Sequence, residues 1–388
     1  MIDPATAAAE IDLGALADNL RYFHELVAPA QLMLAVKAEA YGHGLLPCAA
    51  TARAAGVDWL GVATPDEAMT LRDAGDEGPL LFWLYGPDTD LTPLVAAGVD
   101  ATAHAPEQIS RLVMAAGTAE RVARVHLKID TGMSRNGATP RVWPELCAAA
   151  AEAEAVGALR VVGLWTHLAS ADEPGAPSVP RQLAAFDAAA EVATAAGLQP
   201  ELRHAANSAA ALFVPGSHLD LVRVGIAAYG IDPGPGVIEA ARAPVRPVMR
   251  LRAQLVNVKD VEPGTGVSYG LTWHAEQPTR LGLVPLGYAD GIPRIAGPRA
   301  EVSVAGRRVP VRGRICMDQF VVDLGPAGAE EPLPPGSEAG AEVVIFGPGD
   351  DGEPTVADWA GWAETIGHEI VTGIGGRVGR VFHGAEAP

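Results

Sequence analysis

The feature that most constrains the fold is a regular alternation of two patterns between about residues 30 and 230. Short apolar runs predict buried strands, and the stretches rich in Ala, Leu and Glu between them predict helices, two of which should start at Pro65 and Pro106. The apolar runs cover residues 32–36, 59–63, 80–85, 99–103, 124–129, 160–166, 201–205 and 219–224. Strands that alternate with helices pair in parallel through right-handed crossovers, and eight such units predict a (β/α)8 barrel of the TIM type. A doubly wound open sheet produces the same pattern and stays open as an alternative.

The pattern changes after about residue 240. Pro244 and Pro247 interrupt the chain, and short apolar runs then alternate with Gly/Pro turns. The expected strands cover residues 249–258, 280–285, 301–304, 308–312, 319–323 and 342–346, residues 355–366 predict a helix, and residues 330–340 predict a surface loop. We therefore expect an α/β barrel over residues 1–243 and a mostly β domain over residues 244–388.

The net charge and the cysteine content indicate which partners and which cellular compartment to expect. The 28 Lys and Arg residues are outnumbered by 47 Asp and Glu residues, so the net charge is −19. Nucleic acid or an anionic membrane would repel such a surface, and neither is an expected partner. No apolar run is long enough to span a membrane, and the first residues lack the pattern of a signal peptide. Cys48, Cys147 and Cys316 lie far apart, which argues against a disulfide framework, and we expect a cytoplasmic protein.

Polar residues gather at the C-terminal ends of the expected barrel strands, where barrel enzymes hold their active sites. They are Lys37, Tyr41, Lys128, Arg135, His167, Asn207, Ser208 and Arg223, and Gly225 and Ile226 follow the last of these strands. A desolvated Lys37 would be a nucleophile toward a carbonyl group, and the helix start at Ser208 would suit a phosphate. Each residue also has a structural interpretation: Lys37 could keep its ammonium in water, His167 could belong to the core, and Ser208 could only cap a helix. Arg223 lies between two valines, where a buried charge requires a specific partner.

Two further motifs suggest other chemistry but lack the required context. The segment 266–270 matches the G-x-S-x-G pattern of serine hydrolases, which requires a strand before it and a helix after it. Gly264 precedes the segment and no helical periodicity follows it. His368-Glu369 lacks the second histidine of a zinc-binding H-E-x-x-H motif. We therefore expect neither a serine hydrolase nor a metal site.

The segment Ala35-Val36-Lys37-Ala38-Glu39-Ala40-Tyr41-Gly42-His43-Gly44 resembles the cofactor-attachment signature of the alanine racemases, which use pyridoxal 5′-phosphate. Further similar segments follow in order along nearly the whole chain, at residues 126–133, 165–167, 204–208, 222–226, 267–270, 287–291 and 314–319. The resemblance implies the barrel and β domain already inferred, assembled as a head-to-tail homodimer with shared active sites.

The resemblance also implies roles for individual residues. Lys37 would attach the cofactor and act as one acid/base, and Tyr269, contributed by the other subunit, would act from the opposite face of the substrate. The implied cofactor-binding set is Lys37, Tyr41, Arg135, His167, Asn207, Ser208, Arg223, Gly225, Ile226 and His368, and the substrate-binding set is Arg135, Tyr288, Met317 and Asp318. Within the first set Arg223 would bond the pyridine nitrogen. Lys128 occupies a position that can carry a carbamate in this family.

The implied reaction places physical demands on these residues. A racemase removes the α proton from one face of its substrate and returns a proton to the other, so two bases must flank the reacting carbon. Lysine and tyrosine have reference pKa values of about 10, and burial or neighbouring cations must perturb them. Arg223 and Arg135 are the available cations. An arginine at the pyridine nitrogen keeps that nitrogen unprotonated, which should suppress transamination and favour return of the proton.

Three positions depart from the family pattern. Glu39 stands where the family has Asn or Asp, His368 stands where it has a tyrosine that reaches the phosphate, and residues 375–380 lack the usual tyrosine and proline. We expect a racemase that interconverts L- and D-alanine for cell-wall supply. The alternatives are a racemase of broader specificity, a barrel-type pyridoxal-phosphate decarboxylase with an acid in place of Arg223, and a non-catalytic cofactor-binding homologue without the second domain.

Overall fold

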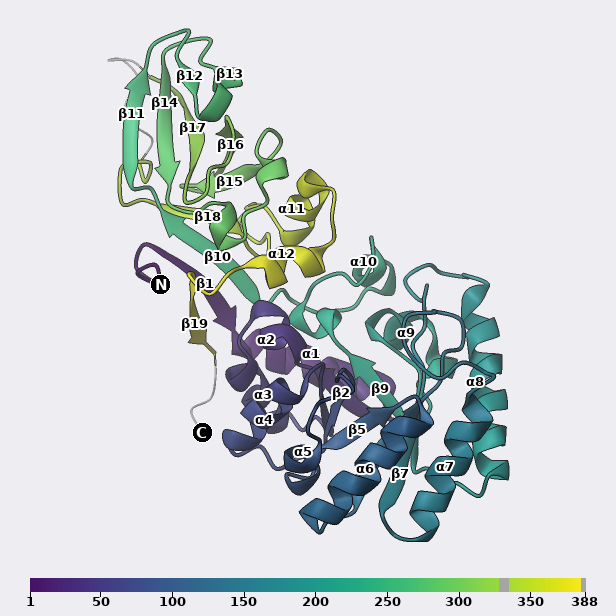
Figure 1. The fold of residues 1–388 in the computed structure, drawn as a ribbon. Coiled ribbons are helices and arrows are strands. Elements are labelled where there is room, and N and C mark those ends of the chain that lie inside the picture. The colour runs from purple at the N-terminus through teal and green to yellow at the C-terminus, as the bar shows by residue number, and fades with distance from the viewer. Residues whose placement is uncertain (328–334, 385–388) are drawn as a thin grey trace.

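The computed structural model describes residues 1–327 and 335–384. Eight parallel strands lie in the order β8-β7-β6-β5-β4-β3-β2-β9 (Figure 1). They are β2 (Gln31–Ala35), β3 (Trp59–Val62), β4 (Leu80–Phe82), β5 (Asp100–Ala103), β6 (Ala123–Lys128), β7 (Leu159–Trp165), β8 (Leu202–His204) and β9 (Leu221–Val224). Backbone N–H groups of Asp220 and Arg223 donate to the carbonyls of Arg203 and Ala206, each at 3.1 Å, and bring the β9 edge to the β8 edge. The barrel is confirmed, and the open sheet is excluded.

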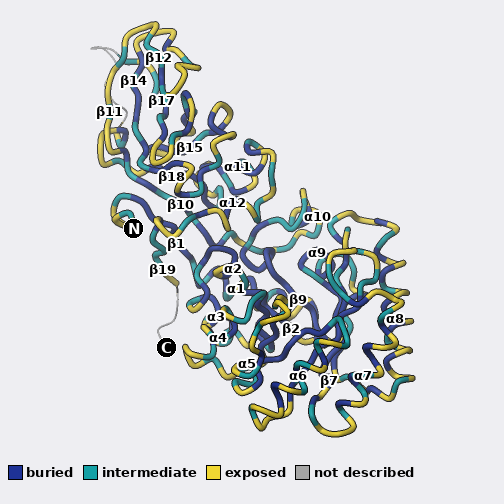
Figure 2. The backbone as a smooth tube through the Cα atoms, viewed as in Figure 1, coloured by how far each residue is buried: buried dark blue, intermediate teal, exposed yellow. Residues whose placement is uncertain are grey.

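Helices cover the outside of the barrel (Figure 1). They are α1 (Leu13–Val27), α3 (Leu45–Ala54), α4 (Pro65–Asp73), α5 (Thr92–Ala96), α6 (Pro106–Ala119), α7 (Trp143–Ala155), α8 (Ser178–Ala195), α9 (Ser208–Phe213) and α10 (Val237–Ala241). The expected helix start at Pro65 is confirmed, since the Thr64 side chain accepts from the N–H of Glu67 and the Glu67 carboxylate accepts from that of Thr64. Figure 2 shows the strands buried and the outer helix surfaces exposed.

The barrel interior is divided between apolar and polar side chains. An apolar cluster separate from the main core is formed by Met33, Trp59, Leu81, Val162, Leu202 and Leu221. Asp100, His126, Lys128 and Arg223 are also buried on the barrel strands. Since buried polar groups are costly unless they are paired, this interior already points to a specific arrangement.

The second domain is built on a nine-stranded sheet in the order β11-β14-β17-β16-β15-β18-β10-β1-β19. Its strands are β1 (Ala7–Asp12), β10 (Met249–Gln254), β11 (Asn257–Val261), β14 (Thr279–Val284), β15 (Glu301–Val304), β16 (Arg307–Arg312), β17 (Phe320–Pro326), β18 (Glu342–Phe346) and β19 (Gly379–His383). The single strand expected over residues 249–258 is two strands. The helix expected over 355–366 is α11 (Val356–Ala363), and α12 (Gly367–Gly373), which was not predicted, follows it. A two-stranded hairpin, β12 (Gly266–Val267) with β13 (Trp273–His274), completes the domain.

The two ends of the chain meet in this second sheet. β1 pairs antiparallel with β10 and parallel with β19 (Figure 1). The segment 7–12 was expected within the barrel domain, whereas its strand belongs to the other sheet. The division at residue 243 stays a prediction in other respects, and part of the loop expected at 330–340 lies outside the described residues. No helix in the described part of the chain is long and apolar enough to cross a membrane.

Candidate active site

One cavity of about 490 Å³ lies at the C-terminal ends of the barrel strands. Every residue expected to bind the cofactor lies on its wall: Lys37, Tyr41, Arg135, Asn207, Ser208, Arg223, Gly225, Ile226, His167 and His368. Most of these residues follow different strands, and His368 comes from α12 in the second domain. Tertiary folding therefore brings together a set that the sequence spreads over most of its length.

Lys37 stands at the start of a strained turn that follows β2. Ala38, Glu39, Ala40 and Tyr41 have φ values of +51°, +56°, +51° and +54°. A left-handed conformation costs a non-glycine residue roughly 1–2 kcal/mol, so four in succession must be stabilised by the surroundings. We call residues 38–41 the left-handed turn. Its presence directly after Lys37 is typical of a functional site.

Three side chains hold the left-handed turn in place. The N–H of Ala38 donates to Glu67 Oε1 at 2.6 Å, which ties the turn to the start of α4. Nδ1 of the fully buried His43 lies 3.0 Å and 2.9 Å from the carbonyl oxygens of Ala40 and Tyr41, so Nδ1 carries the proton. Burial lowers the pKa of His43 to about 4, which keeps the ring a neutral donor. Glu39 Oε2 accepts from the N–H of Leu45 at 3.1 Å, so its extra length serves the start of α3.

Donors gather at the end of the cavity formed by Ser208, Gly225 and Tyr41. Ser208 Oγ accepts from the N–H of Gly225 at 2.9 Å and lies 3.4 Å from that of Ala227. A Cβ added to Gly225 would lie 2.4 Å from the Tyr41 hydroxyl oxygen, so only glycine allows this close approach. Burial raises the pKa of Tyr41, which therefore keeps its hydroxyl proton. Hydroxyl and backbone N–H groups in one place are suited to an anionic oxygen.

Arg223 forms the buried floor at the other end. Its Nη1 donates to His204 Nδ1 at 3.0 Å, and its Nη2 donates to the carbonyls of Thr166 and Ala205 at 2.8 Å and 3.2 Å. Nη2 also lies 3.4 Å from His167 Nδ1. Burial lowers the pKa of Arg223 to about 9, which leaves it charged at neutral pH. An arginine has five N–H donors, so Nε and one hydrogen of Nη1 remain for a ligand in the cavity.

Positive charge dominates the cavity between these two ends. Lys128 Nζ lies 3.9 Å from the centroid of the Trp165 ring, and burial together with Arg223 and Arg135 lowers the pKa of Lys128 to about 7. Burial and Arg135 also lower the pKa of Lys37 below its ordinary value. The cavity therefore favours an anionic ligand and holds lysines that release a proton more easily than in water.

His368 lies on the same wall as the left-handed turn. Its ring centroid is 6.2 Å from that of Tyr41, and its buried Nδ1 has no hydrogen-bond partner among the described residues. Burial, followed by the charge of Lys37, lowers the pKa of His368. Arg380 donates to the carbonyls of Gly42 and Ile374 and so links the left-handed turn to the end of α12. An unsatisfied imidazole nitrogen in a cavity is suited to a ligand atom.

Comparison with known proteins agrees with this geometry. Residues 11–233 match the family model for the alanine racemase N-terminal domain, and residues 248–382 match that for the alanine racemase C-terminal domain. The chain belongs to the alanine racemase family. It is 49% identical over 379 residues to alanine racemase from Thermobifida fusca and 50% identical over 381 residues to that from Streptomyces coelicolor. These alignments cover 98% and 97% of this chain and 98% and 95% of the relatives.

Solved structures of the family have the same fold. Alanine racemase from Streptomyces lavendulae superimposes with a TM-score of 0.95 at 47% identity and covers 99% of this chain and 98% of its own. The structure from Streptomyces coelicolor gives a TM-score of 0.93 at 50% identity, with 97% and 98% covered. The family inferred from the ordered motifs is thereby confirmed, and the chain is an isomerase of the racemase class.

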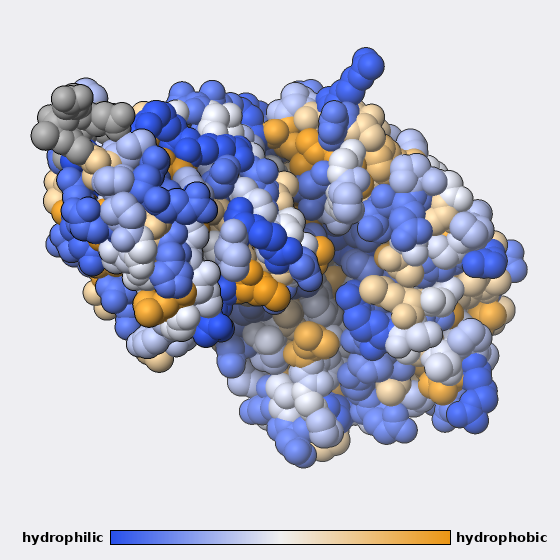
Figure 3. Space-filling view, turned by 90° about the horizontal axis from the view of Figure 1, so that it is seen from above, coloured by the Kyte–Doolittle hydropathy of each residue, from blue (hydrophilic) through white to orange (hydrophobic). Residues whose placement is uncertain are grey.

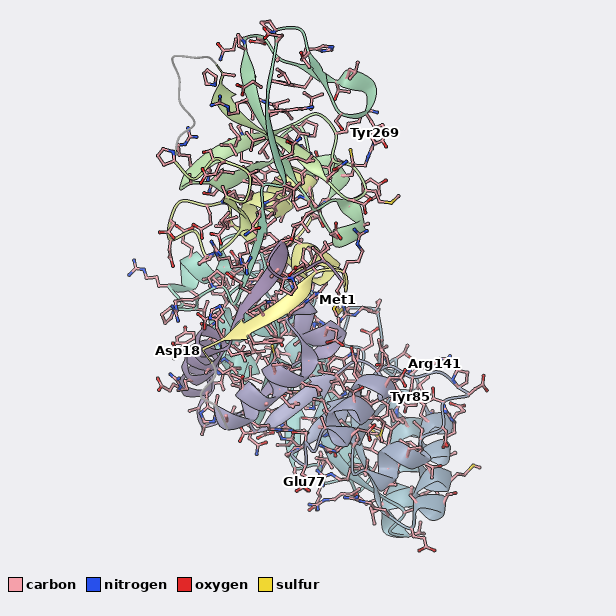
Figure 4. All side chains as sticks on the ribbon, turned by 90° about the vertical axis from the view of Figure 1, so that its left-hand side faces the viewer. Met1, Asp18, Glu77, Tyr85, Arg141 and Tyr269 are labelled. Carbon is pink, nitrogen blue, oxygen red and sulfur yellow. The ribbon has the colours of Figure 1, made fainter. Side chains whose placement is uncertain are left out.

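The second-domain residues expected to act on the substrate lie apart from the cavity, unlike His368. Tyr269, Met317 and Tyr288 are 71%, 52% and 43% exposed, and none of them is among the cavity residues. The backbone N–H of Tyr288 donates to the carbonyl of Cys316, next to Met317. Figure 4 shows Tyr269 on the β domain, away from the barrel residues Tyr85 and Arg141. Seen from above, the surface is hollowed between the two domains, with apolar atoms at its rim (Figure 3).

The remaining motifs of the sequence have structural explanations. Asp318 forms an exposed ion pair with Arg377 at 2.6 Å within the chain. Ser268 Oγ donates to the carbonyl of Arg314 at 2.6 Å, and it follows a two-residue strand and precedes only a three-residue 3₁₀ turn, Tyr269–Leu271, rather than an α-helix. It therefore lacks the setting of a hydrolase nucleophile. Within residues 1–327 and 335–384, no group of three or more His, Cys, Asp or Glu side chains could hold a metal ion.

Several residues at or next to the cavity were not singled out by the sequence reasoning. Trp83 and Asn136 line the cavity, and Trp165 forms the wall beneath Lys128. His204 and His126 are buried and bonded toward Arg223. The available signal was the two-residue period of a strand, which places His126 and Lys128 on one face of β6.

Proposed function

We propose that this chain interconverts L- and D-alanine, with pyridoxal 5′-phosphate as cofactor and Lys37 and Tyr269 as the two bases. The observation that carries the proposal is that the residues expected at the cofactor line one cavity around Lys37, while Tyr269 is exposed outside it. The relatives that cover nearly the whole chain are alanine racemases, which gives the substrate.

The cavity fits the proposed cofactor in size and in the chemistry of its ends. A volume of about 490 Å³ lies in the range of small-molecule sites. Tyr41, Ser208, Gly225 and Ile226 would hold the phosphate, with Asn207 at the same end. Gly225 supports this assignment because a Cβ there would fill the place where hydroxyl and backbone donors converge. The free donors of Arg223 would meet the pyridine nitrogen, with His167 supporting the guanidinium.

The residues of the chain then divide the work of the reaction. When bound, the cofactor supplies the electron sink that stabilises negative charge on the α carbon. Lys37 would attach the cofactor and move a proton at its Nζ, which its lowered pKa makes easier. Arg223 would donate to the pyridine nitrogen and keep a proton from that atom. Arg135, which is exposed and lines the cavity, would bind the cofactor's phenolic oxygen and the substrate carboxylate.

The proposed second base requires a homodimer. Tyr269 and Met317 belong to the exposed surface of their own subunit, and apolar Leu271 and Ile295 are exposed in the same domain. Such exposed apolar side chains are typical of an interface. We propose a head-to-tail dimer in which these residues, with Tyr288 and Asp318, complete the cavity of the other subunit.

Lys128 would serve as an anchor for Arg135. A pKa of about 7 gives Lys128 a large neutral fraction, and a neutral amine reacts with carbon dioxide to form a carbamate. The resulting anion would be stabilised by Arg135 and Arg223, whose charges lower that pKa. An acid-labile carbon-13 carbonyl signal that is lost in Lys128→Met would support this modification.

One alternative substrate range is favoured by a specific residue. Histidine is smaller than the tyrosine expected at position 368, and it lines the cavity. A racemase of broader specificity is therefore the second candidate. The buried Arg223 argues against the decarboxylase, and the complete second domain argues against the non-catalytic homologue. The three cysteines are free, which suits a reducing cytoplasm, where D-alanine would supply cell-wall synthesis.

Chiral analysis tests the proposal directly. Purified protein is incubated with pyridoxal 5′-phosphate and each of a panel of L-amino acids, and both enantiomers are then quantified. We expect L-alanine to approach an equal mixture of enantiomers, with other amino acids converted more slowly. Release of carbon dioxide and an amine would indicate the decarboxylase, and unchanged amino acids throughout would indicate the non-catalytic homologue.

A further inference from the structure

A line of buried hydrogen-bonding groups crosses the barrel interior toward the cavity. Asp100 begins β5, His126 lies within β6, and His204 ends β8 beside Arg223 on β9. Asp100 Oδ2 lies 3.3 Å from His126 Nε2. His126 Nδ1 lies 2.9 Å from His204 Nε2, and His204 Nδ1 lies 3.0 Å from Nη1 of Arg223. These four buried side chains, which we call the interior relay, connect the N-terminal end of the barrel with its C-terminal end.

The two ends of the interior relay determine where every proton lies. Arginine cannot accept a hydrogen bond, so Nδ1 of His204 accepts from Arg223 and Nε2 of His204 carries the proton. A carboxylate only accepts, so Nε2 of His126 donates to Asp100, and Nδ1 of His126 accepts from His204. Both imidazoles are thus neutral Nε2–H tautomers, and all three hydrogen bonds point toward Asp100. Burial, followed by the charge of Arg223, lowers the pKa of His204 well below its ordinary value, which agrees with a neutral ring.

The surroundings of the interior relay make Asp100 important for Arg223. Trp59 meets the His126 ring edge-on at 5.3 Å, and Trp165 stacks on His204 at 5.6 Å. An isolated charge among such groups is costly, and a buried ion is stable only with hydrogen bonds and an opposite charge. Within residues 1–327 and 335–384, Arg223 forms no direct ion pair, and the interior relay ends on the carboxylate of Asp100.

The barrel also makes room for the interior relay. A Cβ added to Gly163 on β7 would lie 2.4 Å from Nδ1 of His126, and Gly163 does not have a positive φ. Alanine therefore suits the backbone there, and the three atoms nearest its Cβ would all belong to the His126 imidazole. Asp100 also accepts at Oδ1 from Nε of the part-exposed Arg124 at 2.8 Å. The same carboxylate therefore binds both Arg124 and the interior relay.

We propose that Asp100 is a positioning residue for the reaction, which acts through His126 and His204 to fix the orientation and donor direction of Arg223 in the cavity. The inference rests on the proposed function for its effect on catalysis, but the relay itself exists in the protein without cofactor. In Asp100→Asn, an amide N–H turned toward His126 would reverse both tautomers and set an N–H of His204 against an N–H of Arg223. An amide oxygen turned toward His126 would preserve the tautomers but remove the negative charge.

The first test uses the protein without cofactor and labelled with nitrogen-15 at histidine. Signals of His126 and His204 are assigned from the His126→Gln and His204→Gln proteins. We expect both rings to be neutral with the proton on Nε2, and His43 to carry its proton on Nδ1. A proton on Nδ1 of His126 or His204 overturns the inference. This measurement is independent of activity, so a wild-type protein that fails to racemise alanine would refute the proposed function alone.

The second test compares Asp100→Asn with the matched control Asp76→Asn. Asp76 is also a mostly buried carboxylate held by two arginines, with Arg53 and Arg72 each at 2.7 Å, but it lies outside the interior relay. We expect Asp100→Asn to shift the imidazole signals of both histidines. It should also lower kcat about tenfold and change KM less than about twofold, as is typical of residues that orient a functional side chain through a hydrogen bond. Transamination per turnover should rise, since a loosened Arg223 protects the pyridine nitrogen less well. Asp76→Asn should leave all these quantities at their wild-type values.

Gly163→Ala provides an uncharged way to disturb the same groups. We expect it to shift the His126 and His204 signals and to change kcat in the same direction as Asp100→Asn, even if Asp100→Asn folds poorly. Wild-type values of kcat and transamination in a Gly163→Ala protein with shifted histidine signals would overturn the inference. An equal fall in kcat for Asp76→Asn and Asp100→Asn would also overturn it, because a general loss of stability would then explain both.

Discussion

The barrel and the β domain present their family residues in opposite ways. In the barrel, Lys37, Arg223 and Ser208 line a cavity, and buried hydrogen bonds fix the positions of Arg223 and Ser208. In the β domain, Tyr269 and Met317 are more than half exposed on the surface. The difference indicates that, under the proposed function, one subunit would hold nearly all of the cofactor site, whereas its Tyr269 would act in another subunit. Changes in the barrel should therefore affect cofactor binding, and changes at Tyr269 should affect proton transfer alone.

The largest effect is expected for Lys37→Ala. Loss of the attachment point and of one base should lower racemisation by at least roughly a thousandfold. The chain has three lysines, of which Lys128 also lines the cavity and Lys259 is exposed. Borohydride reduction followed by peptide mapping should place the cofactor on Lys37. Label on Lys128 would contradict the assignment and show that the cofactor is attached to Lys128 instead. Lys259→Ala serves as the control and should keep wild-type activity.

Tyr269→Phe should impair proton transfer without weakening cofactor binding. We expect α-proton exchange from L-alanine to fall roughly a hundredfold, because a positioned general base contributes on this scale, while exchange from D-alanine falls much less. The cofactor dissociation constant should stay at its wild-type value, since Tyr269 lies outside the cavity of its own subunit. Deuterium exchange from each enantiomer measures the effect. Equal losses from both enantiomers would contradict the two-base assignment.

Mixing two inactive proteins tests whether the halves come from different subunits. In an equal mixture of Lys37→Ala and Tyr269→Phe, half of the dimers should be mixed, and each should contain one site with both wild-type residues. About one quarter of the wild-type activity should therefore return after subunit exchange in a twofold-symmetric dimer. Exchange is monitored with a size tag on one variant. No recovery after proven exchange would place Tyr269 in the site of its own subunit.

The smallest effect is expected for His368→Tyr. Burial and Lys37 lower the pKa of His368 in the free protein, and a bound phosphate would raise it. Binding would then take up a proton, so the extra cofactor affinity is full below the free-protein pKa and is lost as pH rises through the bound-state pKa. We expect His368→Tyr to flatten the pH dependence of cofactor dissociation between about pH 5 and 9, with differences of severalfold. His24→Tyr, at an exposed position on α1, should reproduce the wild-type profile, and an identical profile for His368→Tyr would show that His368 does not contact the phosphate.

Local pattern was sufficient to predict most of the barrel. Apolar runs located its strands to within a few residues, and Pro65 and Pro106 marked the starts of α4 and α6. The site was predictable because barrel topology gathers the C-terminal ends of its strands, so a position along the chain already gives a position in space. Lys37 and Arg223 could be assigned to one site on this basis before any distance was known.

Other features depended on contacts between distant segments. The strands β1 and β19 carry little local signal of their sheet, because their partners lie at the other end of the chain and in β10. The left-handed turn after Lys37 depends on Glu67 and His43, which stabilise a conformation that the sequence Ala-Glu-Ala-Tyr disfavours.

The sequence by itself therefore determined the two kinds of domain, the family and the candidate residues, because strand and helix periods and ordered motifs are local properties of a chain. Only the tertiary structure decided that Asp100 is bonded through two histidines to Arg223, and that Tyr269 is exposed while Lys37 is half-buried on the cavity wall. Hydrogen-bond direction and burial depend on which side chains meet across the barrel. The order of the strands and the closure of the barrel fix these contacts, and neither can be derived from a single segment of the chain.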